Sequence, residues 1–476
     1  MKLSTLLKGI ETKSSFKDVE IERVTDKDKD VVNNTLFVCI DGGRTDGHTV
    51  AKNLVSKGAV AFLTERDLGI ENQIIVNDTR EVFSKIAANF YNNPARKLNI
   101  IGVTGTNGKT STSYFIRDIL NSLNKKCGLI GTVNNIVGTE ILNSTLTTPE
   151  PMEIQELLYK MVQNGMEYCV MEVSSQAISQ KRVYGIEFSV VILTNITPEH
   201  LDYHITMENY INTKLSILNM AKTAVLNIDD ENIKNNMEKI KIPYKTISLF
   251  NGNADYIAKN VECTSDGVKF LMVGMESIDR ISSKIIGNFT VYNILCAITA
   301  LISIGFSFME LTNSIQYVNF VKGRGEKIEN TKGINIYIDF AHTPSGLLNI
   351  LNCLREFTVG RLIVVFGCGG DRDKSKRPIM GKIAGENSDF AIITTDNPRS
   401  ENTLLIINDI LGGMEHSTSK IAVVENRKDA IEYALKMAKK NDTVLIAGKG
   451  HEMTQFINGL EFPFDERKII ENYFKT

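Results

Sequence analysis

Apolar residues along this chain gather in short runs, and segments of helical length separate one run from the next. The runs occupy residues 35–40, 59–63, 98–103, 168–173, 188–194, 224–228, 334–340, 362–366, 391–395 and 444–447. Residues 110–123 carry a helical pattern. Short, nearly continuous apolar strands that alternate with helices are typical of parallel sheets covered on both faces. The pattern therefore predicts an α/β fold.

Two breaks in this pattern predict three domains. The turn-forming residues Asn92, Asn93 and Pro94 end the first stretch, and a second break falls near residues 330–333. A length of 476 residues also suits about three domains. We expect an N-terminal α/β domain at 1–97, a central P-loop domain with a mainly parallel sheet at 98–330, and a C-terminal Rossmann-like domain at 331–476.

Composition narrows the classes of partner. The chain is 42% hydrophobic and 23% charged, and its net charge of -2 does not favour a nucleic acid or an acidic membrane as partner. The seven scattered cysteines lack metal-binding spacing and favour thiols in a reducing compartment. Lys8 interrupts the apolar residues of the N-terminus, and no apolar run has the length of a membrane span. We expect a soluble, cytoplasmic protein without membrane insertion.

The loop at residues 104–110, TGTNGKT, joins an apolar run to the predicted helix. Such a loop offers phosphates a cradle of backbone N–H groups, a lysine charge and a threonine hydroxyl for Mg²⁺. It departs from the strict P-loop pattern, because Val103 stands where a glycine is usual. An ordinary glycine-rich turn would not need Gly108, Lys109 and Thr110 together, so the loop favours nucleotide binding.

Two further segments carry candidate metal ligands. Glu172 ends an apolar run and could hold the Mg²⁺ of a bound nucleotide, although alone it reads as a surface glutamate. His200 lies in a stretch that holds two of only six histidines, and its neutral imidazole could ligate a second metal. A single histidine is more often structural, but the gathering of histidines at strand ends favours a function.

Four polar loops follow apolar runs of the third domain, at residues 339–344, 367–373, 396–399 and 448–452. Routine turns would explain their glycines and prolines but not their repeated Asp, Arg and His residues. Ligands of open α/β sheets bind at the carboxyl ends of the strands. The four loops therefore predict a substrate cleft at one edge of the C-terminal sheet.

Nine motifs together resemble those of the Mur ligases, over essentially the whole chain. In order they are TGTNGKT, TTPE, MEVSS, HLDYH, GNFTVYN, AHTPS, GCGGDRDKSKRP, DNPR and GKGHE. Among these ligases the chain is most similar to the type that adds the third residue of the peptidoglycan stem peptide. The resemblance implies that ATP converts the terminal carboxylate of UDP-N-acetylmuramoyl-L-alanyl-D-glutamate into an acyl phosphate. An amino acid, here meso-2,6-diaminopimelate, then attacks through its amine.

The resemblance also implies a UDP-binding N-terminal domain and roles for individual residues; separately, we expect a monomer. For ATP these residues are Gly105, Thr106, Asn107, Gly108, Lys109, Thr110, Ser111, Asn293, Arg324, Asp339 and His342. For the UDP-muramoyl peptide they are Thr147, Thr148, Ser174, Gln180 and Arg182, and for the amino acid Arg372, Asp396, Asn397, Arg399, Gly448 and Glu452. The implied metal site is Thr110, Glu172, His200 and Lys214, and the implied catalytic residues are Lys109, Lys214, His200 and Glu172.

Lys214 and Arg399 carry the two most specific expectations. The sequence alone favours a solvated helical lysine at position 214, whereas the resemblance implies a lysine carbamylated by CO₂ near Mg²⁺. The guanidinium of Arg399 offers a planar fork of donors that fits a carboxylate. Diaminopimelate has a distal carboxylate that lysine lacks, so Arg399 favours diaminopimelate; the alternative is a surface arginine that caps a turn.

The chain departs from the Mur ligase pattern at a few places, and other functions stay open. Residues 27–29 read Lys-Asp-Lys where Asp-Ser-Arg is usual, which affects the contacts to the uracil end. Gln176, Glu199 and Thr454 replace a His, an Asp and a Tyr. A lysine-adding ligase or a paralogue of another pathway is one alternative, and a non-catalytic nucleotide-binding protein is another. The latter would be free to lose the catalytic residues, all of which are present.

Overall fold

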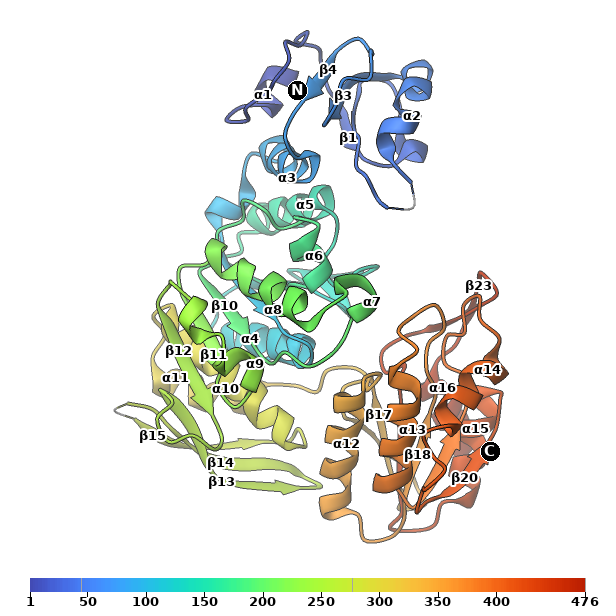
Figure 1. Cartoon of the computed structure of the whole chain (residues 1–476). Coiled ribbons are helices and arrows are strands. Elements are labelled where there is room, and N and C mark those ends of the chain that lie inside the picture. The colour runs from blue at the N-terminus through green and yellow to red at the C-terminus, as the bar shows by residue number, and fades with distance from the viewer. Residues whose placement is uncertain (44, 276, 476) are drawn as a thin grey trace.

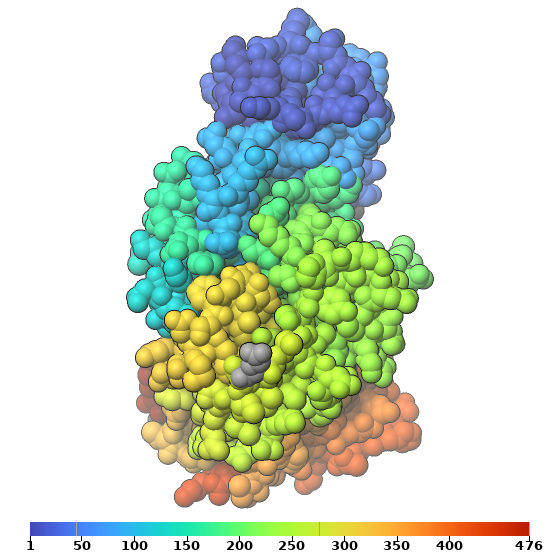
Figure 2. Space-filling view, turned by 90° about the vertical axis from the view of Figure 1, so that its left-hand side faces the viewer, coloured from blue at the N-terminus to red at the C-terminus, as the bar shows by residue number. Residues whose placement is uncertain are grey.

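The structure, a computed structural model, describes residues 1–43, 45–275 and 277–475. Three large sheets follow one another along the chain, and Figure 1 shows the N-terminal and C-terminal sheets on opposite sides of the central one. The space-filling view of Figure 2 likewise places the N-terminal and C-terminal parts of the chain at opposite ends. This arrangement confirms the predicted α/β fold. No helix in the described part of the chain is long and apolar enough to span a membrane.

The N-terminal sheet has four parallel strands in the order β1-β2-β3-β4. Its elements are β1 (Arg23–Thr25), β2 (Thr35–Val38), β3 (Ala59–Thr64), β4 (Gln73–Ile75), α1 (Leu3–Leu6), α2 (Gly47–Leu54) and α3 (Thr79–Phe90). All four residues of β2 are buried, as expected of a strand that is covered on both faces. The predicted runs 35–40 and 59–63 therefore fall on the middle strands of this sheet.

The central sheet has eleven strands in the order β15-β14-β13-β12-β11-β10-β5-β9-β6-β7-β8. Its strands are β5 (Asn99–Thr104), β6 (Cys127–Ile130), β7 (Asn134–Val137), β8 (Glu140–Asn143), β9 (Tyr168–Glu172), β10 (Val190–Leu193), β11 (Ala224–Asn227), β12 (Tyr244–Ser248), β13 (Tyr256–Thr264), β14 (Gly267–Val273) and β15 (Ile278–Ser283). The strands from β13 to β6 in this order run parallel, and antiparallel strands extend both edges. The carboxyl ends of β5, β9 and β10 therefore meet at one edge, where ligands of such sheets bind.

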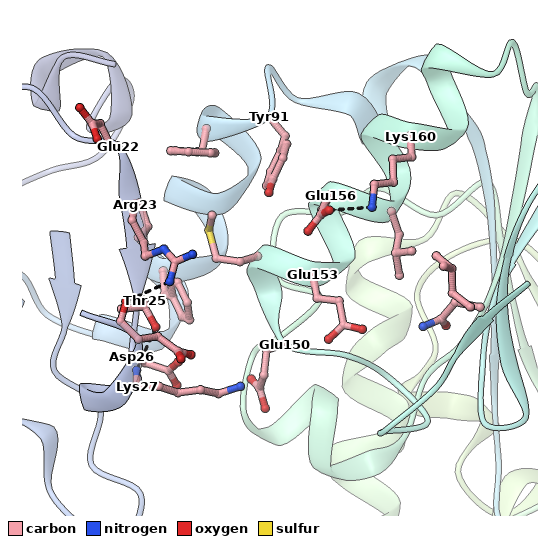
Figure 3. Close-up of a pocket in the computed structure, with 18 of the residues that line it drawn as sticks. Glu22, Arg23, Thr25, Asp26, Lys27, Tyr91, Glu150, Glu153, Glu156 and Lys160 are labelled. Carbon is pink, nitrogen blue, oxygen red and sulfur yellow. Dashed lines mark hydrogen bonds and ion pairs between the residues drawn. The ribbon is translucent and has the colours of Figure 1, made fainter. Parts of the chain in front are cut away.

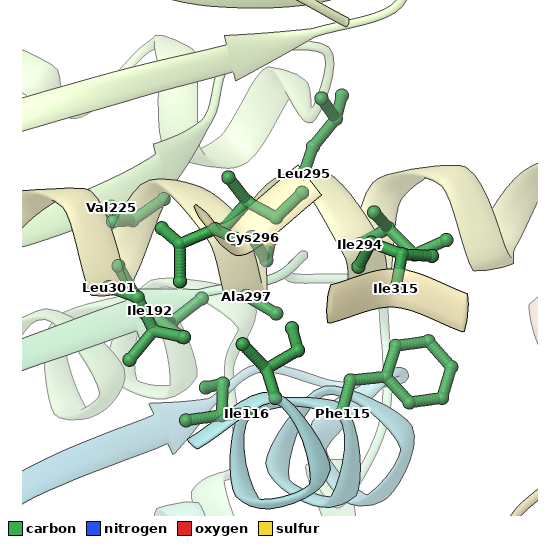
Figure 4. Close-up of a cluster of buried hydrophobic side chains, with 14 of the residues drawn as sticks. Phe115, Ile116, Ile192, Val225, Ile294, Leu295, Cys296, Ala297, Leu301 and Ile315 are labelled. Atoms are coloured by element: carbon green, nitrogen blue, oxygen red, sulfur yellow. The ribbon is translucent and has the colours of Figure 1, made fainter. Parts of the chain in front are cut away.

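Eight helices belong to this described central region. They are α4 (Lys109–Ser122), α5 (Pro151–Gln163), α6 (Ser175–Ser179), α7 (Leu201–His204), α8 (Met207–Ser216), α9 (Glu231–Lys234), α10 (Asn288–Ser303) and α11 (Phe308–Ser314). Most side chains of α10 are buried, and Figure 4 shows Ala297 and Leu301 facing Ile116 of α4 and Ile192 of β10. A helix that is apolar almost all round is held inside the protein, which fixes its first turn beside the loop before α4.

The C-terminal sheet has the order β16-β17-β21-β18-β19-β20, and only β16 is antiparallel. Its strands are β16 (Glu326–Ile328), β17 (Asn335–Asp339), β18 (Leu362–Phe366), β19 (Phe390–Ile393), β20 (Lys420–Val423) and β21 (Thr443–Ala447), with the hairpin β22 (Thr454–Ile457) and β23 (Leu460–Pro463) beside it. Its helices are α12 (Pro344–Phe357), α13 (Lys376–Asn387), α14 (Thr403–Leu411), α15 (Arg427–Met437) and α16 (Glu466–Lys475). The sheet thus begins before residue 331, the limit predicted for the third domain, because β16 is too short and polar to register as an apolar run.

Candidate active site

The loop between β5 and α4 approaches its neighbours so closely that two glycines are required. Gly105 has a φ of 147° and Gly108 a φ of 85°, values that side chains strongly disfavour. A Cβ at Gly108 would lie 2.6 Å from Asn293 Oδ1, and one at Gly105 would overlap Thr194 Oγ1. The loop therefore keeps its backbone N–H groups bare at the amino end of α4, a favourable place for phosphate.

Two lysines bind the carbonyl groups of this loop. Lys109 Nζ donates to Gly105 O at 2.9 Å and to Thr106 O at 2.8 Å, and Lys214 Nζ donates to the same Gly105 O at 2.9 Å. Lys214 is only 1% exposed and lies 4.8 Å from the centre of the Tyr210 ring. Burial first and the charge of Lys109 second lower the pKa of Lys214 far below its ordinary value. The expectation of a solvated Lys214, which the sequence alone favours, is therefore wrong.

Glu172, at the end of β9, is completely buried and fully hydrogen-bonded. Thr110 Oγ1 donates to its carboxylate at 2.8 Å, and Thr132 donates through its backbone N at 2.8 Å and its Oγ1 at 2.9 Å. Arg324 Nη2 donates to Thr110 Oγ1 at 3.2 Å. The expected pair of Thr110 and Glu172 is thus in contact. The sequence gave no role to Thr132, although it follows the carboxyl end of β6, next to β9 in the sheet.

The histidines form a second cluster around Glu199. Glu199 lies 3.2 Å from His342 Nε2 and 3.7 Å from His200 Nε2, so it links the central and C-terminal regions. Burial would raise the pKa of Glu199, but the hydrogen bond from His342 and the charge of His200 hold it well below its usual range. Burial lowers the pKa of His200, which favours the neutral imidazole that a metal ligand needs. His204 instead bonds Ser175 Oγ at 2.9 Å and is structural.

A cavity of about 200 Å³ opens beside the phosphate loop, between the central region and α12. Asn107, Gly108 and Asn293 line it, together with Tyr292 and Ser345. Asn107 Nδ2 donates to Ser345 Oγ at 3.0 Å, which closes one side of the cavity across the two regions. Three of the residues expected to bind ATP thus share this cavity. The sequence assigned no role to Ser345, although it ends the AHTPS motif.

Arg324, Asp339 and His342 lie together on the C-terminal side of the loop. The guanidinium of Arg324 stacks 4.4 Å from the centre of the Phe340 ring. Asp339 Oδ2 accepts from Gly325 N at 2.6 Å, and His342 Nδ1 lies 2.9 Å from Phe340 O. Burial raises the pKa of Asp339, and Arg324 opposes that rise. These contacts fix Arg324 against Thr110, so its charge faces the phosphate loop.

The five residues expected to bind the UDP-muramoyl peptide lie together next to Glu172. Thr148 Oγ1 donates to Glu172 O at 2.8 Å and accepts from Ser174 N at 3.0 Å, and Thr147 Oγ1 lies 3.1 Å from Thr132 Oγ1. Gln180 Oε1 accepts from Arg182 Nε and Nη2 at 3.0 and 2.6 Å. Arg182 also donates to Thr148 O and pairs with Glu150 at 3.0 Å.

A larger cavity of about 680 Å³ lies between the N-terminal sheet and α5 (Figure 3). Its charged lining comprises the acids Glu22, Asp26, Asp30, Glu150, Glu153 and Glu156 and the bases Arg23, Lys27 and Lys160. Burial raises the pKa of both Asp26 and Glu150. Through Glu150 this cavity connects to Arg182, and six acids against three bases make its wall predominantly acidic.

The six residues expected to bind an amino acid gather at the carboxyl ends of β18, β19 and β21. Asn397 Nδ2 donates to Glu452 Oε2 at 2.9 Å, while the buried Lys449 donates to both side chains at 3.0 and 2.7 Å. A Cβ at Gly448 would lie 2.7 Å from Asp396 Oδ2. The sequence assigned no role to Lys449, although it stands inside the GKGHE motif.

Two of these six residues are arginines, Arg372 and Arg399. Arg399 has a φ of 53° and donates through Nη1 to Gly370 O at 2.7 Å. Burial lowers the pKa of Arg399, and the charge of the nearby Arg372 lowers it further. Two neighbouring guanidinium groups favour an anionic ligand, because an anion relieves their mutual repulsion.

Relatives of known name match the chain from end to end. One from Caldanaerobacter subterraneus subsp. tengcongensis is 43% identical over 99% of this chain and 98% of its own, and one from Clostridium botulinum is 42% identical over 100% of both. Both are called UDP-N-acetylmuramoyl-L-alanyl-D-glutamate–2,6-diaminopimelate ligase. A solved structure with that same name is 28% identical, with a TM-score of 0.70 over 100% of this chain and 99% of its own. MurF from Acinetobacter baumannii, 16% identical with a TM-score of 0.67 over 99% and 98%, shares the fold.

Three family models match successive parts of the chain. "Mur ligase family, catalytic domain" matches residues 29–91, "Mur ligase middle domain" residues 103–301, and "Mur ligase, glutamate ligase domain" residues 323–450. Their order along the chain is that of the three sheets. With full-length relatives above 40% identity, these matches establish that the chain belongs to the Mur ligase family.

Proposed function

We propose that this enzyme uses ATP to join meso-2,6-diaminopimelate to UDP-N-acetylmuramoyl-L-alanyl-D-glutamate, a step of peptidoglycan precursor synthesis. The names of the full-length relatives support this reaction. The observation that carries the choice of amino acid is the pair Arg399 and Arg372 beside the Asn397–Lys449–Glu452 network. We further propose a cytoplasmic monomer with domains near 1–97, 98–330 and 331–476, the last limit moved ahead of β16.

ATP would lie along the loop between β5 and α4. Its phosphates would meet the backbone N–H groups from Gly105 to Ser111 and the charges of Lys109 and Arg324, and its base would enter the cavity at Asn293. A solved MurF from Thermotoga maritima, in complex with ADP, is 18% identical to this chain, with a TM-score of 0.63 over 89% of this chain and 93% of its own. At this identity the similarity concerns the fold alone. The proposal that ATP binds here is supported by the residues that line the cavity.

The residues around Glu172 suit Mg²⁺, which prefers oxygen ligands and keeps several waters. The Thr110 hydroxyl donates to Glu172 and accepts from Arg324, which leaves one lone pair of its oxygen to face a cation. No three His, Cys, Asp or Glu side chains in the described part of the chain could hold a metal alone, so phosphate oxygens would complete the site. When bound, Mg²⁺ would neutralise charge on the transferring phosphoryl group.

Lys214 would act as a carbamate. Its lowered pKa favours the neutral amine, whose lone pair can attack CO₂; the N–C bond forms and one proton is released to solvent. The buried neutral amine is thereby converted into an anion that could help to place Mg²⁺ near His200. The crowding of Lys109 and Lys214 around Gly105 O supports this proposal, because two neighbouring ammonium groups destabilise each other.

The two ends of the site would divide the reaction. At the phosphate end, Lys109 and Arg324 stabilise negative charge while the glutamyl carboxylate displaces ADP and forms an acyl phosphate. At the amino-acid end, the Arg399 fork pairs with the distal carboxylate of diaminopimelate, and Glu452 holds the ammonium beside it. The free amine then attacks the acyl phosphate, the amide bond forms, and phosphate leaves.

The deciding experiment is phosphate release by purified enzyme with ATP, Mg²⁺, UDP-muramoyl dipeptide and a panel of amino acids. We expect turnover with meso-diaminopimelate and a kcat/KM for lysine lower by about 10⁴-fold, because lysine leaves the Arg399 guanidinium without its anion. Preference for lysine would instead support the lysine-adding alternative. No turnover with any amino acid would support a paralogue of another pathway or a protein without catalysis.

A further inference from the structure

Strained backbone in this chain gathers at the candidate site. Thirteen described non-glycine residues have positive φ, and eight of them are asparagines, which tolerate this conformation. The remaining five are Lys181, His200, Ile205, Asp371 and Arg399. Four of these are site residues or their direct neighbours: Lys181 lies between Gln180 and Arg182, and Asp371 precedes Arg372. Only Ile205 has no role so far.

Ile205 also has an unusual backbone conformation. Its φ of 69° and ψ of -48° fall outside the left-handed helical region. Thr206 N donates to His204 O at 2.8 Å, so Ile205 is the centre of a γ-turn of the rare, positive-φ kind. A β-branched residue is especially unfavourable there. Glycine would form the same turn at far lower cost, so the turn alone does not explain an isoleucine.

The side chain of Ile205 gains little from folding in this structure. It is 79% exposed, and the nearby Tyr203 is 42% exposed. A strained residue normally persists because its surroundings hold it, but an isoleucine in solvent has few contacts of that kind. A bound molecule that covers the side chain would supply the missing contacts, because removing apolar surface from water is favourable.

The position of this turn indicates which substrate it meets. The turn joins α7, which follows His200, to α8, which carries Lys214. Figure 1 shows α7 on the side of the central region that faces the C-terminal region. Tyr203 Oη lies 3.4 Å from Gln180 Nε2 and 3.4 Å from Ser179 Oγ, so α7 packs beside the residues proposed to hold the muramoyl peptide.

We infer that Ile205 is a substrate-contacting residue: its side chain, with the Tyr203 ring, forms an apolar wall for the alanyl-glutamyl stem of the UDP-muramoyl substrate. The stem offers a methyl group and methylene groups, which suit this wall, while Gln180 and Arg182 meet its polar atoms. The inference rests on the proposed function and adds a specificity-determining residue to it. The backbone strain at Ile205 is then the cost of presenting a side chain where glycine would fold better.

Three substitutions separate the side chain from the strain. Ile205→Val keeps the branched side chain, Ile205→Ala removes most of it but keeps a Cβ at positive φ, and Ile205→Gly removes both. We expect Ile205→Ala and Ile205→Gly to raise the KM for UDP-muramoyl dipeptide about tenfold. The KM values for ATP and for diaminopimelate should stay within about twofold, and Ile205→Val should resemble the wild type.

Thermal unfolding supplies the second readout. Ile205→Gly should raise Tm by about 2–4 °C through relief of strain, whereas Ile205→Ala should not. Asn124→Gly, at an exposed positive-φ asparagine after α4, is the matched control and should leave every KM unchanged. A loss of substrate affinity together with a gain of stability is the expected signature of a contact residue, and it cannot come from a damaged fold.

The outcomes distinguish this inference from the proposed function. If the wild type neither binds UDP-muramoyl dipeptide in calorimetry nor turns it over, the proposed function fails. If the wild type works and Ile205→Gly is more stable with an unchanged KM, the inference is overturned. A fall in kcat with no change in that KM also overturns it, because Ile205 would then act on the approach of the C-terminal region rather than on the substrate.

Discussion

The phosphate end and the amino-acid end of the site handle positive charge in opposite ways. At the phosphate end, Lys109 and Lys214 bind backbone carbonyls of one loop, and glycines hold that loop in contact with β10 and α10. At the amino-acid end, Arg399 donates to the carbonyls of Gly370 and Asn397 and stands beside a second, exposed arginine, Arg372. The first arrangement concentrates positive charge at the loop where the phosphates of ATP would bind. The second presents a guanidinium whose planar N–H groups can pair with one carboxylate. We infer that the phosphate end provides rate and the amino-acid end provides selection.

The largest effect is expected at the phosphate end. Lys109→Ala should lower kcat about 10⁴-fold, because it removes a charge from the transferring phosphoryl group. The measurement is phosphate release at saturating substrates. Lys125→Ala, at a surface lysine paired with Glu167, is the control and should be close to the wild type. Near-normal turnover by Lys109→Ala would remove the proposed role of this end in catalysis.

At the amino-acid end, a substitution should change the selectivity between diaminopimelate and lysine. Arg399→Ala should lower kcat/KM for diaminopimelate about 10²- to 10³-fold while leaving the slow reaction with lysine nearly unchanged, since only the former loses an ion pair. Competition between the two amino acids measures this selectivity. Arg355→Ala, at a surface arginine paired with Asp389, serves as control. Selectivity that survived in Arg399→Ala would show that the guanidinium does not read the distal carboxylate.

Substitution of Lys214 tests whether the phosphate end uses a carbamate anion in addition to the lysine and arginine cations. Lys214→Ala should lower kcat about 10²-fold, and short carboxylic acids such as formate or acetate should restore part of the rate, because they replace the carbamate. Lys109→Ala, which lacks a cation instead, should gain nothing from the same acids. Mass analysis of the native protein should show an added CO₂ on Lys214; a bare ammonium in an active, ligand-bound structure would contradict the proposal.

The smallest effect concerns the support of the amino-acid end. Glu401 binds the buried Arg377 and accepts from Asp371 N at 2.6 Å, and the hydrogen bond from Arg377 lowers its pKa from 4.5 to about 2. A lowered carboxyl pKa stabilises the fold above the unfolded pKa, and this contribution is lost as pH falls from about 4.5 through 2. Glu401→Gln should therefore lower Tm by a few degrees at pH 7 and progressively less below pH 4.

The control for this measurement is Glu432→Gln, at an exposed glutamate that pairs with Lys428 four residues earlier on α15. Exposed pairs of this kind contribute little to stability, so its Tm should stay close to that of the wild type at every pH. If the difference in Tm between Glu401→Gln and the wild type stayed the same at low pH, the charge of the Glu401 carboxylate would be excluded as the source of the stabilisation.

Sequence patterns predicted the parts of this protein that repeat a simple physical rule. Apolar runs marked the parallel strands, and polar residues such as Glu172 and Asp396 lie at or just after the carboxyl ends of strands of their own sheets. Roles for single residues at the site came from the resemblance, and they stay predictions until ligands or variants test them. The buried state of Lys214 is different, because no local pattern distinguishes a helical lysine that faces a loop from one that faces solvent.

Other features depend on distances that a sequence does not contain. Thr132 donates a hydrogen bond to Glu172, forty residues later in the sequence. Ser345 accepts one from Asn107, although it lies on α12 of the C-terminal region. The acidic wall of the larger cavity combines residues of the N-terminal sheet with α5. Ile205 was missed for another reason: an isoleucine in a loop gives no sign of a positive φ, which only the backbone reveals.

The short strand β16 has a consequence for protein engineering. Arg324, two residues before it, touches Thr110 in the central region, while β16 itself pairs with β17 in the C-terminal sheet. The boundary between the two regions therefore runs through the proposed ATP site. A chimera joined at residue 331 would combine the Arg324 and β16 of one parent with the sheet of another. In a chimera that exchanges the whole C-terminal region, the junction should lie before Gly323. Arg324 and the sheet that positions it then come from the same parent.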